Sequence, residues 1–340
     1  MKIVVDKDIP FIEGRIHNEN EVVYLSGNKF TADIVADADA LIIRTRTICD
    51  ELLLKGSKVK LIATATIGTD HIDIPWCEQH GIIVRSAPGC NAPGVAQYVL
   101  SSLFNTGFDP SCHTLGIVGF GNVGGIIGKW AREMGIKILV CDPLRKEAGL
   151  NDVDYLPLQK TLQESDAVTL HVPLTFHGKY ATNRFIGKEE LSLMKDKAMI
   201  VNSSRGGVVD ERCLKESILS GKIRTVVDVW ENEPEIDREL LELADIATPH
   251  IAGYSFEGKK RGTMMVLKAL ESIMSVKVNY DGLECFPDTN QQWISREIIQ
   301  QSYNPEIDSV SLKMNPDRFE ELRNHYEFRH EPMFFNLAKL

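Results

Sequence analysis

The chain has 340 residues, which at roughly 150 residues per domain predicts two domains and leaves room for a small third segment. Apolar residues make up 43% and charged residues 25%, a balance that excludes a disordered, collagen-like or coiled-coil chain. The formal net charge of −10 argues against general affinity for nucleic acid or for an anionic membrane surface.

The first ninety residues contain five short β-branched runs, most of them separated by segments of helical length. This alternation is typical of an open sheet of parallel strands. We expect these strands at residues 3–5, 22–25, 40–43, 61–65 and 82–84. The sequence Met1–Asp6 has the pattern of a first strand rather than of a signal peptide.

Residues 93–104 lack Gly and Pro after Gly94 and are apolar on most sides, which predicts a buried helix between two domains. A second series of strands is then expected at residues 115–118, 137–141, 167–171, 198–202, 225–229 and 246–248. We therefore predict an α/β fold with two Rossmann-like, doubly wound parallel-sheet domains and a small C-terminal extension.

After the last strand, the helical spacing of apolar residues in 258–275 predicts a helix that returns the chain to the first domain. Further on, Asn315 is expected to cap a helix that begins with Pro316. The last 60 residues cannot easily build a core alone, so we expect them to pack on the body of the protein or on a second subunit.

The segment Gly119–Gly124 has the pattern Gly-x-Gly-x-x-Gly between a predicted strand and a predicted helix. This pattern is typical of dinucleotide binding, in which Gly119 allows a tight turn, Gly121 lets the pyrophosphate approach and Gly124 allows close helix packing. The backbone of Asn122 and Val123 then offers unpaired N–H groups to the phosphates.

Asp142 ends the next predicted strand, 21 residues after Gly121, where an acid that binds the ribose hydroxyls is expected. Its carboxylate would repel a 2′-phosphate, so NAD is favoured over NADP. The nearby cation Arg145 keeps NADP as an alternative.

Three later strands end in polar residues, and in a doubly wound sheet such residues meet where ligands bind. These ends carry Arg205, the pair Glu231 and Glu233, and His250. A histidine can exchange a proton with a hydroxyl near neutral pH, a carboxylate stabilises its charged form, and an arginine grips a substrate carboxylate.

Together the Gly-x-Gly-x-x-Gly motif with Asp142, the Ser-Arg-Gly-Gly run at Arg205, the acidic segment 228–234 and Pro249-His250 resemble the D-2-hydroxyacid dehydrogenase family. The segments 63–73, 87–92 and 250–259 and the tail 319–326 are similar to one subfamily that acts on a phosphorylated 2-hydroxy acid. The resemblance covers nearly the whole chain.

The resemblance implies a role for each matching residue. Arg205 would anchor the substrate carboxylate, Glu233 would be the partner of His250, and His250 would exchange the proton. Glu231 remains the alternative to Glu233, because the segment after Arg205 is one residue shorter than expected. For the cofactor, Asp228 would hold the nicotinamide carboxamide and the backbone of Val172 and Gly253 would contact it. For the substrate, the implied contacts are Thr45, Thr66 and Tyr254.

The substrate phosphate requires a local cation in this acidic protein, and Arg44 and Arg46 flank Thr45 directly after a predicted strand. We expect one of the two to bind the phosphate, without choosing between them.

The implied domains are a substrate-binding domain (1–91 and 257–280), an NAD-binding domain (92–256) and a C-terminal region that supports a homodimer (281–340). The alternatives are another dehydrogenase of the family, acting on phosphoglycerate or glyoxylate, and a non-catalytic scaffold that senses NAD(H).

Seven cysteines without a Cys-x-x-Cys pair are typical of reduced thiols, and no stretch approaches the ~20 apolar residues of a membrane span. His113 beside Cys112 has no partner at metal-ligand spacing, so we expect no metal. These features predict a cytoplasmic enzyme with no nucleic-acid or membrane partner.

Overall fold

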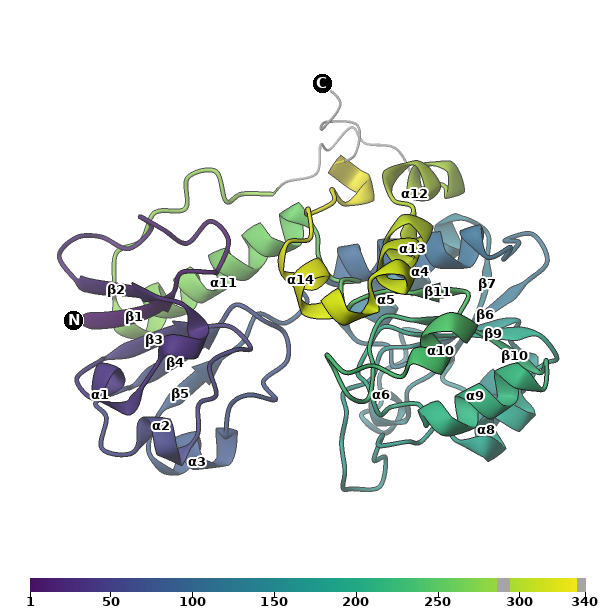
Figure 1. Cartoon of the computed structure of the whole chain (residues 1–340), viewed down its shortest axis with the longest axis horizontal. Helices are drawn as coiled ribbons and strands as arrows, with labels where there is room; N and C mark the ends of the chain where they lie inside the picture. Colours follow the sequence, from purple (N-terminus) through teal and green to yellow (C-terminus); the bar gives the residue numbers. More distant parts are fainter. Residues whose placement is uncertain (286–293, 335–340) are drawn as a thin grey trace. The chain divides into compact units, whose positions relative to one another are not determined.

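The computed structural model describes residues 1–285 and 294–334 (Figure 1). The chain divides into two compact units. The first unit comprises Met1–Asn91 and Ser255–Pro287, and the second comprises Ala92–Tyr254 and Asp288–Leu340. Of the described residues of the tail, 281–285 therefore belong to the first unit and 294–334 to the second. Residues 286–293 and 335–340 of the region expected to dimerise lie outside the described residues.

The first unit is built on a parallel sheet with the strand order β2-β1-β3-β4-β5. Its strands are β1 (Lys2–Asp6), β2 (Glu21–Leu25), β3 (Ala40–Ile43), β4 (Leu61–Thr64) and β5 (Ile83–Arg85). Its helical segments are η1 (Gly27–Lys29), α1 (Ala32–Val35), α2 (Glu51–Leu54), α3 (Ile74–Gln79) and α11 (Phe256–Met274). Both β3 and β4 are buried over their whole length, because apolar clusters cover both faces of the sheet.

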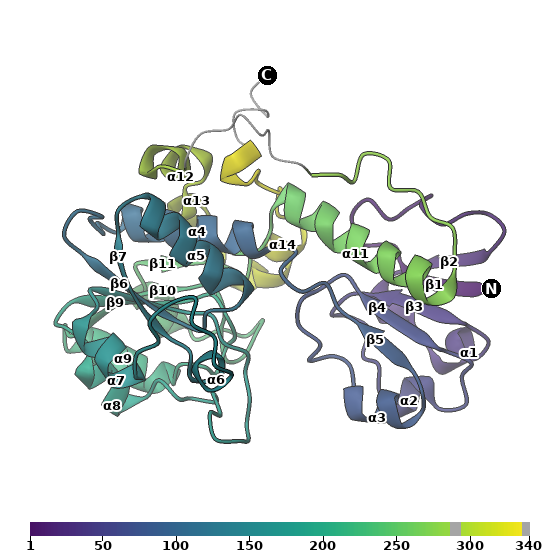
Figure 2. The ribbon, with the colours of Figure 1, turned by 180° about the vertical axis from the view of Figure 1, so that it is seen from behind.

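Helix α11 is distant in sequence from the strands that it covers. Its residues Val266, Leu267 and Leu270 pack in one core with Ile3 and Ile42 of the sheet, and Figures 1 and 2 show it lying along the strands. Full burial of each such side chain is worth about 1.5–3 kcal/mol. The apolar face predicted for residues 258–275 thus completes the first unit.

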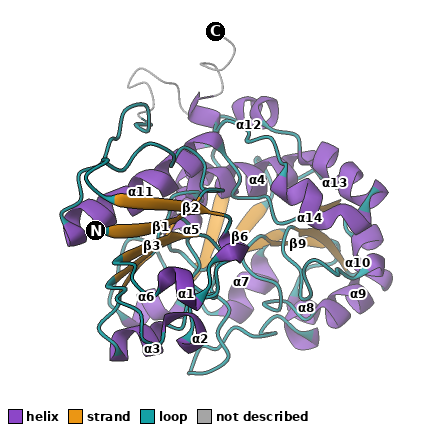
Figure 3. Ribbon diagram, turned by 60° about the vertical axis from the view of Figure 1, so that its left-hand side comes forward, coloured by secondary structure: helices purple, strands orange, loops and turns teal. Residues whose placement is uncertain are grey.

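The second unit contains a parallel sheet with the order β11-β10-β9-β8-β6-β7. Its strands are β6 (Thr114–Val118), β7 (Lys137–Cys141), β8 (Ala167–Leu170), β9 (Ala198–Asn202), β10 (Ile223–Val227) and β11 (Ile246–Ala247). The helices between and before them are α4 (Ala92–Asn105), α5 (Asn122–Glu133), α6 (Pro143–Glu147), α7 (Leu158–Glu164), α8 (Lys188–Leu193), α9 (Glu211–Leu219) and α10 (Arg238–Leu243). Helices flank the strands of each sheet in Figure 3, and the predicted fold class is confirmed.

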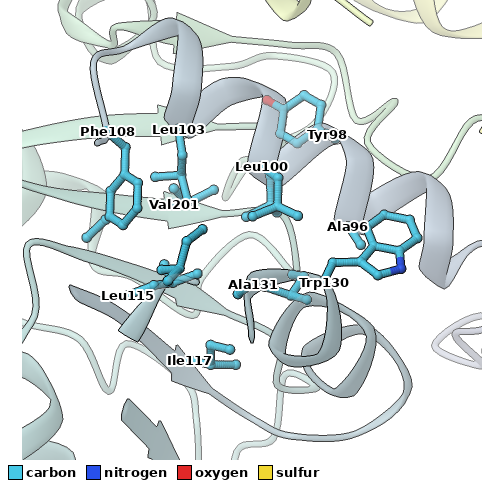
Figure 4. Packing of buried hydrophobic residues seen from close by; sticks show 14 of the residues in the cluster. Ala96, Tyr98, Leu100, Leu103, Phe108, Leu115, Ile117, Trp130, Ala131 and Val201 are labelled. Atoms are coloured by element: carbon cyan, nitrogen blue, oxygen red, sulfur yellow. The ribbon is translucent and has the colours of Figure 1, made fainter. Parts of the chain in front are cut away.

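Helices α4 and α5 form one face of the core of the second unit. Tyr98 and Leu103 of α4 pack with Trp130 of α5, with Leu115 of β6 and with Val201 of β9, as Figure 4 shows. From Val95 to Phe104 every residue of α4 is buried, which explains the apolar composition of this helix on all sides.

The described tail forms α12 (Arg296–Ser302), α13 (Pro305–Met314), η2 (Pro316–Arg318), α14 (Phe319–Asn324) and η3 (Pro332–Phe334). In α13, Ser309 accepts a hydrogen bond from the backbone N–H of Ala247 (3.0 Å), so this helix covers the edge strand β11. Among the described helices, none is long and apolar enough to cross a membrane.

A short helix, η2, begins at Pro316 as expected, with Asn315 at its N-cap position, but the expected side-chain cap is wrong. The side-chain amide of Asn315 donates instead to the carbonyl oxygen of Ser311 (3.1 Å) at the end of α13. A helix begins at Pro305 in the expected manner, because Asn304 accepts a hydrogen bond from the N–H of Glu306 (3.1 Å).

Because all strands in a sheet are parallel, their carboxyl ends meet at one edge. The strand order reverses between β6 and β8 in the second unit and between β1 and β3 in the first. Ligands of open α/β sheets bind beyond the carboxyl ends at such reversals.

Candidate active site

The glycine loop after β6 has the shape of a phosphate cradle. Gly119 has φ +87°, and a Cβ there would lie 2.4 Å from the carbonyl oxygen of His171. A Cβ on Gly124 would lie 2.1 Å from the carbonyl oxygen of Gly119. A Cβ on Gly121 would meet nothing within 4 Å, so the protein itself leaves open the space that a pyrophosphate needs. Helix α5 begins at Asn122 and Val123, directly beside this space.

Asp142 joins the end of β7 to the glycine loop. Its carboxylate accepts hydrogen bonds from the backbone N–H groups of Phe120 (2.8 Å) and Arg145 (3.0 Å). The guanidinium of Arg145 is directed to the hydroxyl of Tyr155 (2.9 Å) and to Asp152 (3.0 Å). The cation that suggested NADP is therefore paired with an acid and a phenol of its own neighbourhood.

His250 follows β11 and contacts a glutamate from the loop after β10. Its Nδ1 lies 2.8 Å from Oε2 and 3.1 Å from Oε1 of Glu233. Burial acts to raise the pKa of Glu233, but the hydrogen bond and charge of His250, together with the charge of Arg323 and the N–H of Trp230, hold the pKa below its ordinary value. The carboxylate is therefore ionised and available to an imidazolium.

Glu231 has different partners. Its Oε2 accepts a hydrogen bond from Arg184 (2.7 Å), and its Oε1 accepts one from the backbone N–H of Glu211 (3.3 Å). Of the two glutamates that the sequence left open, the geometry places Glu233 against His250.

Asp228 organises the loop that carries His250. Its buried carboxylate accepts hydrogen bonds from the Thr248 hydroxyl (2.7 Å) and from the backbone N–H groups of Ile251 (2.8 Å) and Ala252 (3.0 Å). Burial raises the pKa of this carboxyl group. The Asp228 carboxylate thus contacts residues on both sides of His250, namely the Thr248 side chain before it and the Ile251 and Ala252 backbone after it. Gly253 follows directly.

Arg205 lies in the loop after β9, next to the loop after β10. A Cβ on Gly206 would lie 1.8 Å from the carbonyl oxygen of Trp230, so only glycine allows this approach of the two loops. Asn202 fixes the turn by donating to the Arg205 carbonyl oxygen (3.0 Å), and Arg205 Nη1 donates to the carbonyl oxygen of Ser204 (2.8 Å). The loops that carry Arg205, Glu233 and His250 therefore follow three neighbouring strands, β9, β10 and β11.

The remaining predicted cofactor residue, Val172, follows β8, on the other side of the strand reversal from Gly119. It lies close to the glycine loop, because the Cβ position of Gly119 is 3.0 Å from Cγ1 of Val172. Tyr254 ends the second unit, where its hydroxyl accepts a hydrogen bond from Nε of Arg323 (3.3 Å).

The other predicted substrate residues belong to the first unit. Arg44, Thr45 and Arg46 follow β3 at the strand reversal of that sheet. Arg44 donates to the carbonyl oxygen of Asp8 (2.7 Å), and Arg46 lies 3.9 Å from the Asp8 carboxylate. Thr66 follows β4, and its hydroxyl is hydrogen-bonded to that of Thr64 (2.7 Å). Both arginines rest on the loop after β1, so the contacts do not distinguish between them.

Similarity to known proteins covers almost the whole chain. Residues 97–252 match the family described as D-isomer specific 2-hydroxyacid dehydrogenase, NAD binding domain. The erythronate-4-phosphate dehydrogenase of Bacteroides fragilis is 44% identical over 341 residues, which cover 97% of each chain. That of Yersinia enterocolitica is 37% identical, with 97% of this chain and 93% of the relative covered. The chain belongs to the D-2-hydroxyacid dehydrogenase family.

Solved structures agree with this membership. The NAD⁺-bound 3-phosphoglycerate dehydrogenase of Entamoeba histolytica has a TM-score of 0.66 at 27% identity, with 81% of this chain and 95% of that chain covered. The present D-2-hydroxyacid dehydrogenase is an NAD-dependent enzyme. The cradle between Gly119 and Gly124 fits this cofactor, and Asp142 follows β7 next to this cradle, where the sequence predicts an acid that binds the ribose.

Sequence reasoning missed two arginines of the tail, which lie near the loops that carry Glu233 and His250. Arg323 of α14 lies 3.5 Å from Oε2 of Glu233, and the half-buried Arg329 is hydrogen-bonded to the loop after His250. Each lies more than 70 residues from these partners, and neither belongs to a short motif. The similarity of the tail to this family was the only signal, and it did not single out these side chains.

Proposed function

We propose that this enzyme oxidises 4-phospho-D-erythronate to 2-oxo-3-hydroxy-4-phosphobutanoate with NAD, as a step in the biosynthesis of pyridoxal 5′-phosphate (vitamin B6). The observation that carries the proposal is the pairing of His250 with Glu233 in the unit that holds the NAD cradle. The choice of substrate is supported by relatives of this name that align over nearly the full chain.

In this proposal His250, Glu233, Arg205 and Asp228 share proton transfer, substrate binding and positioning. His250 uses Nδ1 for Glu233, which leaves Nε2 to take the proton of the 2-hydroxyl group. Glu233 stabilises the imidazolium that results, and Arg205 holds the substrate carboxylate. Asp228 keeps the His250 loop in place and binds the nicotinamide carboxamide.

NAD, when bound, accepts the hydride that leaves C2 of the substrate. The backbone of Asn122, Val123, Val172 and Gly253 and the carboxylate of Asp142 would hold the cofactor. The overall change is a 2-hydroxy acid and NAD⁺ giving a 2-oxo acid, NADH and a proton, so the imidazolium of His250 returns its proton to solvent after each turnover.

The test is a steady-state assay with NAD across 4-phosphoerythronate, 3-phosphoglycerate, D-lactate and glycerate. We expect the highest kcat/KM for 4-phosphoerythronate. His250→Ala should lower kcat at least ~100-fold, as for the loss of an acid–base group, while NADH binding stays near wild type. A higher kcat/KM for another acid would contradict the proposed substrate, and a fully active His250→Ala would contradict the proposed catalysis.

For the substrate phosphate we propose Arg44 or Arg46, assisted by Thr45 and Thr66, and we propose Tyr254 as a further substrate contact. Support comes from the position of both arginines at the strand reversal of the first sheet, where ligands bind in such folds. Their shared partner Asp8 is itself fixed, because its N–H donates to the buried Asp6 (3.0 Å).

Replacing the phosphate-binding arginine by Met should lower kcat/KM for 4-phosphoerythronate by roughly 10- to 150-fold, the worth of a charge-assisted hydrogen bond. Slow activity on an unphosphorylated 2-hydroxy acid should remain. Arg85→Met, an exposed arginine of the same unit, is the matched control. If activity on both substrates falls equally, the arginine is needed for the fold rather than for the phosphate. If neither variant loses activity, the proposed phosphate site is wrong, and residues 259–261 are the next candidates.

We also propose a cytoplasmic homodimer. Reduced cysteines support the compartment, since all seven are free thiols. Support for the dimer comes from α13, where Ile307, Val310 and Met314 are 69%, 56% and 75% exposed and are spaced to lie on one face of the helix.

A further inference from the structure

The tail reaches the proton-transfer pair through helix α14. Arg323 Nη1 lies 3.5 Å from Glu233 Oε2, the same oxygen that lies 2.8 Å from Nδ1 of His250. The Nε of Arg323 donates to the hydroxyl of Tyr254 (3.3 Å). One guanidinium therefore connects the partner of the catalytic histidine with the tyrosine expected to contact substrate. The side chain of Arg323 is only 20% exposed, so this charge is weakly screened by solvent.

Arg329, which follows α14, attaches this part of the tail to the catalytic loop. Its guanidinium donates to the side chain of Gln97 (3.0 Å) and to backbone carbonyl oxygens of Gly94 (3.0 Å), Ile251 (3.1 Å), Ala252 and Tyr254 (3.2 Å). It also lies 4.3 Å from the ring centroid of Tyr303. A partly buried guanidinium needs such partners, and three of them here, Ile251, Ala252 and Tyr254, belong to the loop after His250. The position of α14 is thus coupled to that of the loop.

The same loop is held by opposite charges. The Asp228 carboxylate accepts from the N–H groups of Ile251 and Ala252, and the Arg329 guanidinium donates to the carbonyl oxygens of the same two residues. The loop cannot shift toward either charge without losing hydrogen bonds to the other. Asp228 and the tail residue Arg329 therefore hold the same stretch of backbone, directly after His250.

We propose that Arg323 is a positioning residue of this pair, which holds Glu233 and limits how readily His250 keeps a proton. The inference rests on the proposed function. Arg323 and the imidazolium compete for one carboxylate oxygen, so the arginine weakens the attraction between Glu233 and the proton on His250. On the loops after β9, β10 and β11, the other ionisable groups include Arg205, Asp228, Glu231, Glu235, Asp237 and Tyr254, and on α14 they are Glu320 (3.9 Å from Arg323) and Glu321.

Removal of Arg323 should shift the pH–rate profile of oxidation to higher pH. Oxidation requires neutral His250, so activity falls at low pH when the imidazole is protonated. Without Arg323, Glu233 interacts with the imidazolium alone and stabilises it more strongly. The acidic limb of the pH–rate profile should therefore move to higher pH. Loss of Glu233 should move the same limb to lower pH.

The experiment compares pH profiles of kcat/KM for 4-phosphoerythronate in full-length wild type, Arg323→Met, Arg323→Lys and Glu233→Gln. We expect Arg323→Met to move the acidic limb up by about half to one pH unit, equivalent to a roughly 3- to 10-fold change in the protonation equilibrium. Maximal kcat/KM should fall by about 10-fold or more, because Glu233 loses a constraint, while the Kd for NADH remains near wild type. Arg323→Lys should restore most of the limb position, since it keeps the charge.

Arg318→Met, which removes an exposed arginine just before α14, is the matched control and should leave the profile unchanged. A lower kcat/KM in Arg323→Met with an unmoved limb would mean a merely structural role, and a profile equal to wild type would mean no role. Either result overturns the inference. If Glu233→Gln leaves the limb in place, the proposed acid–base pair itself is wrong, which is a separate failure.

Discussion

Asp142 serves the backbone as well as the expected cofactor. Its carboxylate receives the N–H groups of Phe120 and Arg145, so it ties the glycine loop to the end of β7. We predict that Asp142→Ser lowers the ratio of kcat/KM for NAD over NADP by roughly 10- to 150-fold, because a charge-assisted bond to ribose is lost and repulsion of the 2′-phosphate is removed.

Kinetics with both cofactors check this prediction. Asp196→Ser, which removes an exposed carboxylate paired with Lys222, is the control. An unchanged ratio in Asp142→Ser, or a wild type that prefers NADP, would show that Asp142 does not select the cofactor.

Single residues were predictable where a motif fixes their spacing. Gly119, Gly124 and Asp142 stand at the expected places because their roles depend on one strand, one turn and one helix. Arg323 and Arg329 could not be found in this way, because their partners come from loops far away in the chain. The sequence alone does not show which arginines are partly buried, as Arg323 and Arg329 are, and which are exposed. This difference appears only when the tail is folded.

At the scale of elements, two carboxylates connect α9 to the loop that carries Glu233. Oε1 of Glu211 accepts a hydrogen bond from the N–H of Glu231 (2.7 Å), and Glu231 accepts one from the N–H of Glu211. Burial, with the charge of Glu231 as a further cause, raises the pKa of Glu211 to about 7. In the unfolded chain this carboxyl titrates near the ordinary value of about 4.3.

The folded state therefore favours protonated Glu211. The stabilisation from this group is fully present below about pH 4 and is lost as the pH rises through about 7. We predict that Glu211→Gln, which keeps the acceptor oxygen, raises the free energy of unfolding at pH 8 by on the order of 1 kcal/mol after discounting for partial exposure. That corresponds to about 2–4 °C in Tm.

Thermal unfolding at pH 8 and pH 5 tests this. The gain should be smaller at pH 5, where the wild-type carboxyl is mostly protonated, and the exposed Glu216→Gln on the same helix should show no gain at either pH. An equal gain at both pH values would exclude ionisation of Glu211 as the cause.

Whole elements were easier to predict than their ends. All eleven expected strands are present. Central strands such as β3, β4 and β9 are buried on both faces and produce continuous apolar runs, while the edge strands β2 and β5 are recognised by short β-branched runs. The end of α13 was missed, since Asn and Pro serve equally to close one helix and to open another. The side chain of Asn315 bonds to Ser311, one turn earlier, and so belongs to the end of α13. The Asn-Pro pattern alone does not show which of the two helices the side chain contacts.

For the molecule as a whole, the proposed dimer makes a prediction about α13. Its buried residues Ser309 and Leu312 face the second unit, while Ile307, Val310 and Met314 are exposed. We predict that Ile307→Glu combined with Val310→Glu converts the dimer to a monomer, because a carboxylate cannot be buried unpaired in an apolar interface. Light scattering after size-exclusion chromatography measures the mass.

Leu219→Glu is the control, since Leu219 is 64% exposed on α9 and lies outside the tail. It should leave the mass unchanged. A wild type that is monomeric at micromolar concentration, or a double variant that stays dimeric, would contradict the assignment of this face.

The discontinuous first unit has a consequence for synthesis on the ribosome. All five strands of its sheet have been made once residue 85 is translated, but the face covered by α11 lacks its partner until residue 274. At roughly 5–20 residues per second, translation of the intervening segment takes about 10–40 s. During that time Ile3, Ile42 and their neighbours have no covering helix. The nascent chain thus presents an apolar surface, accessible to chaperones, that is covered once α11 has been made.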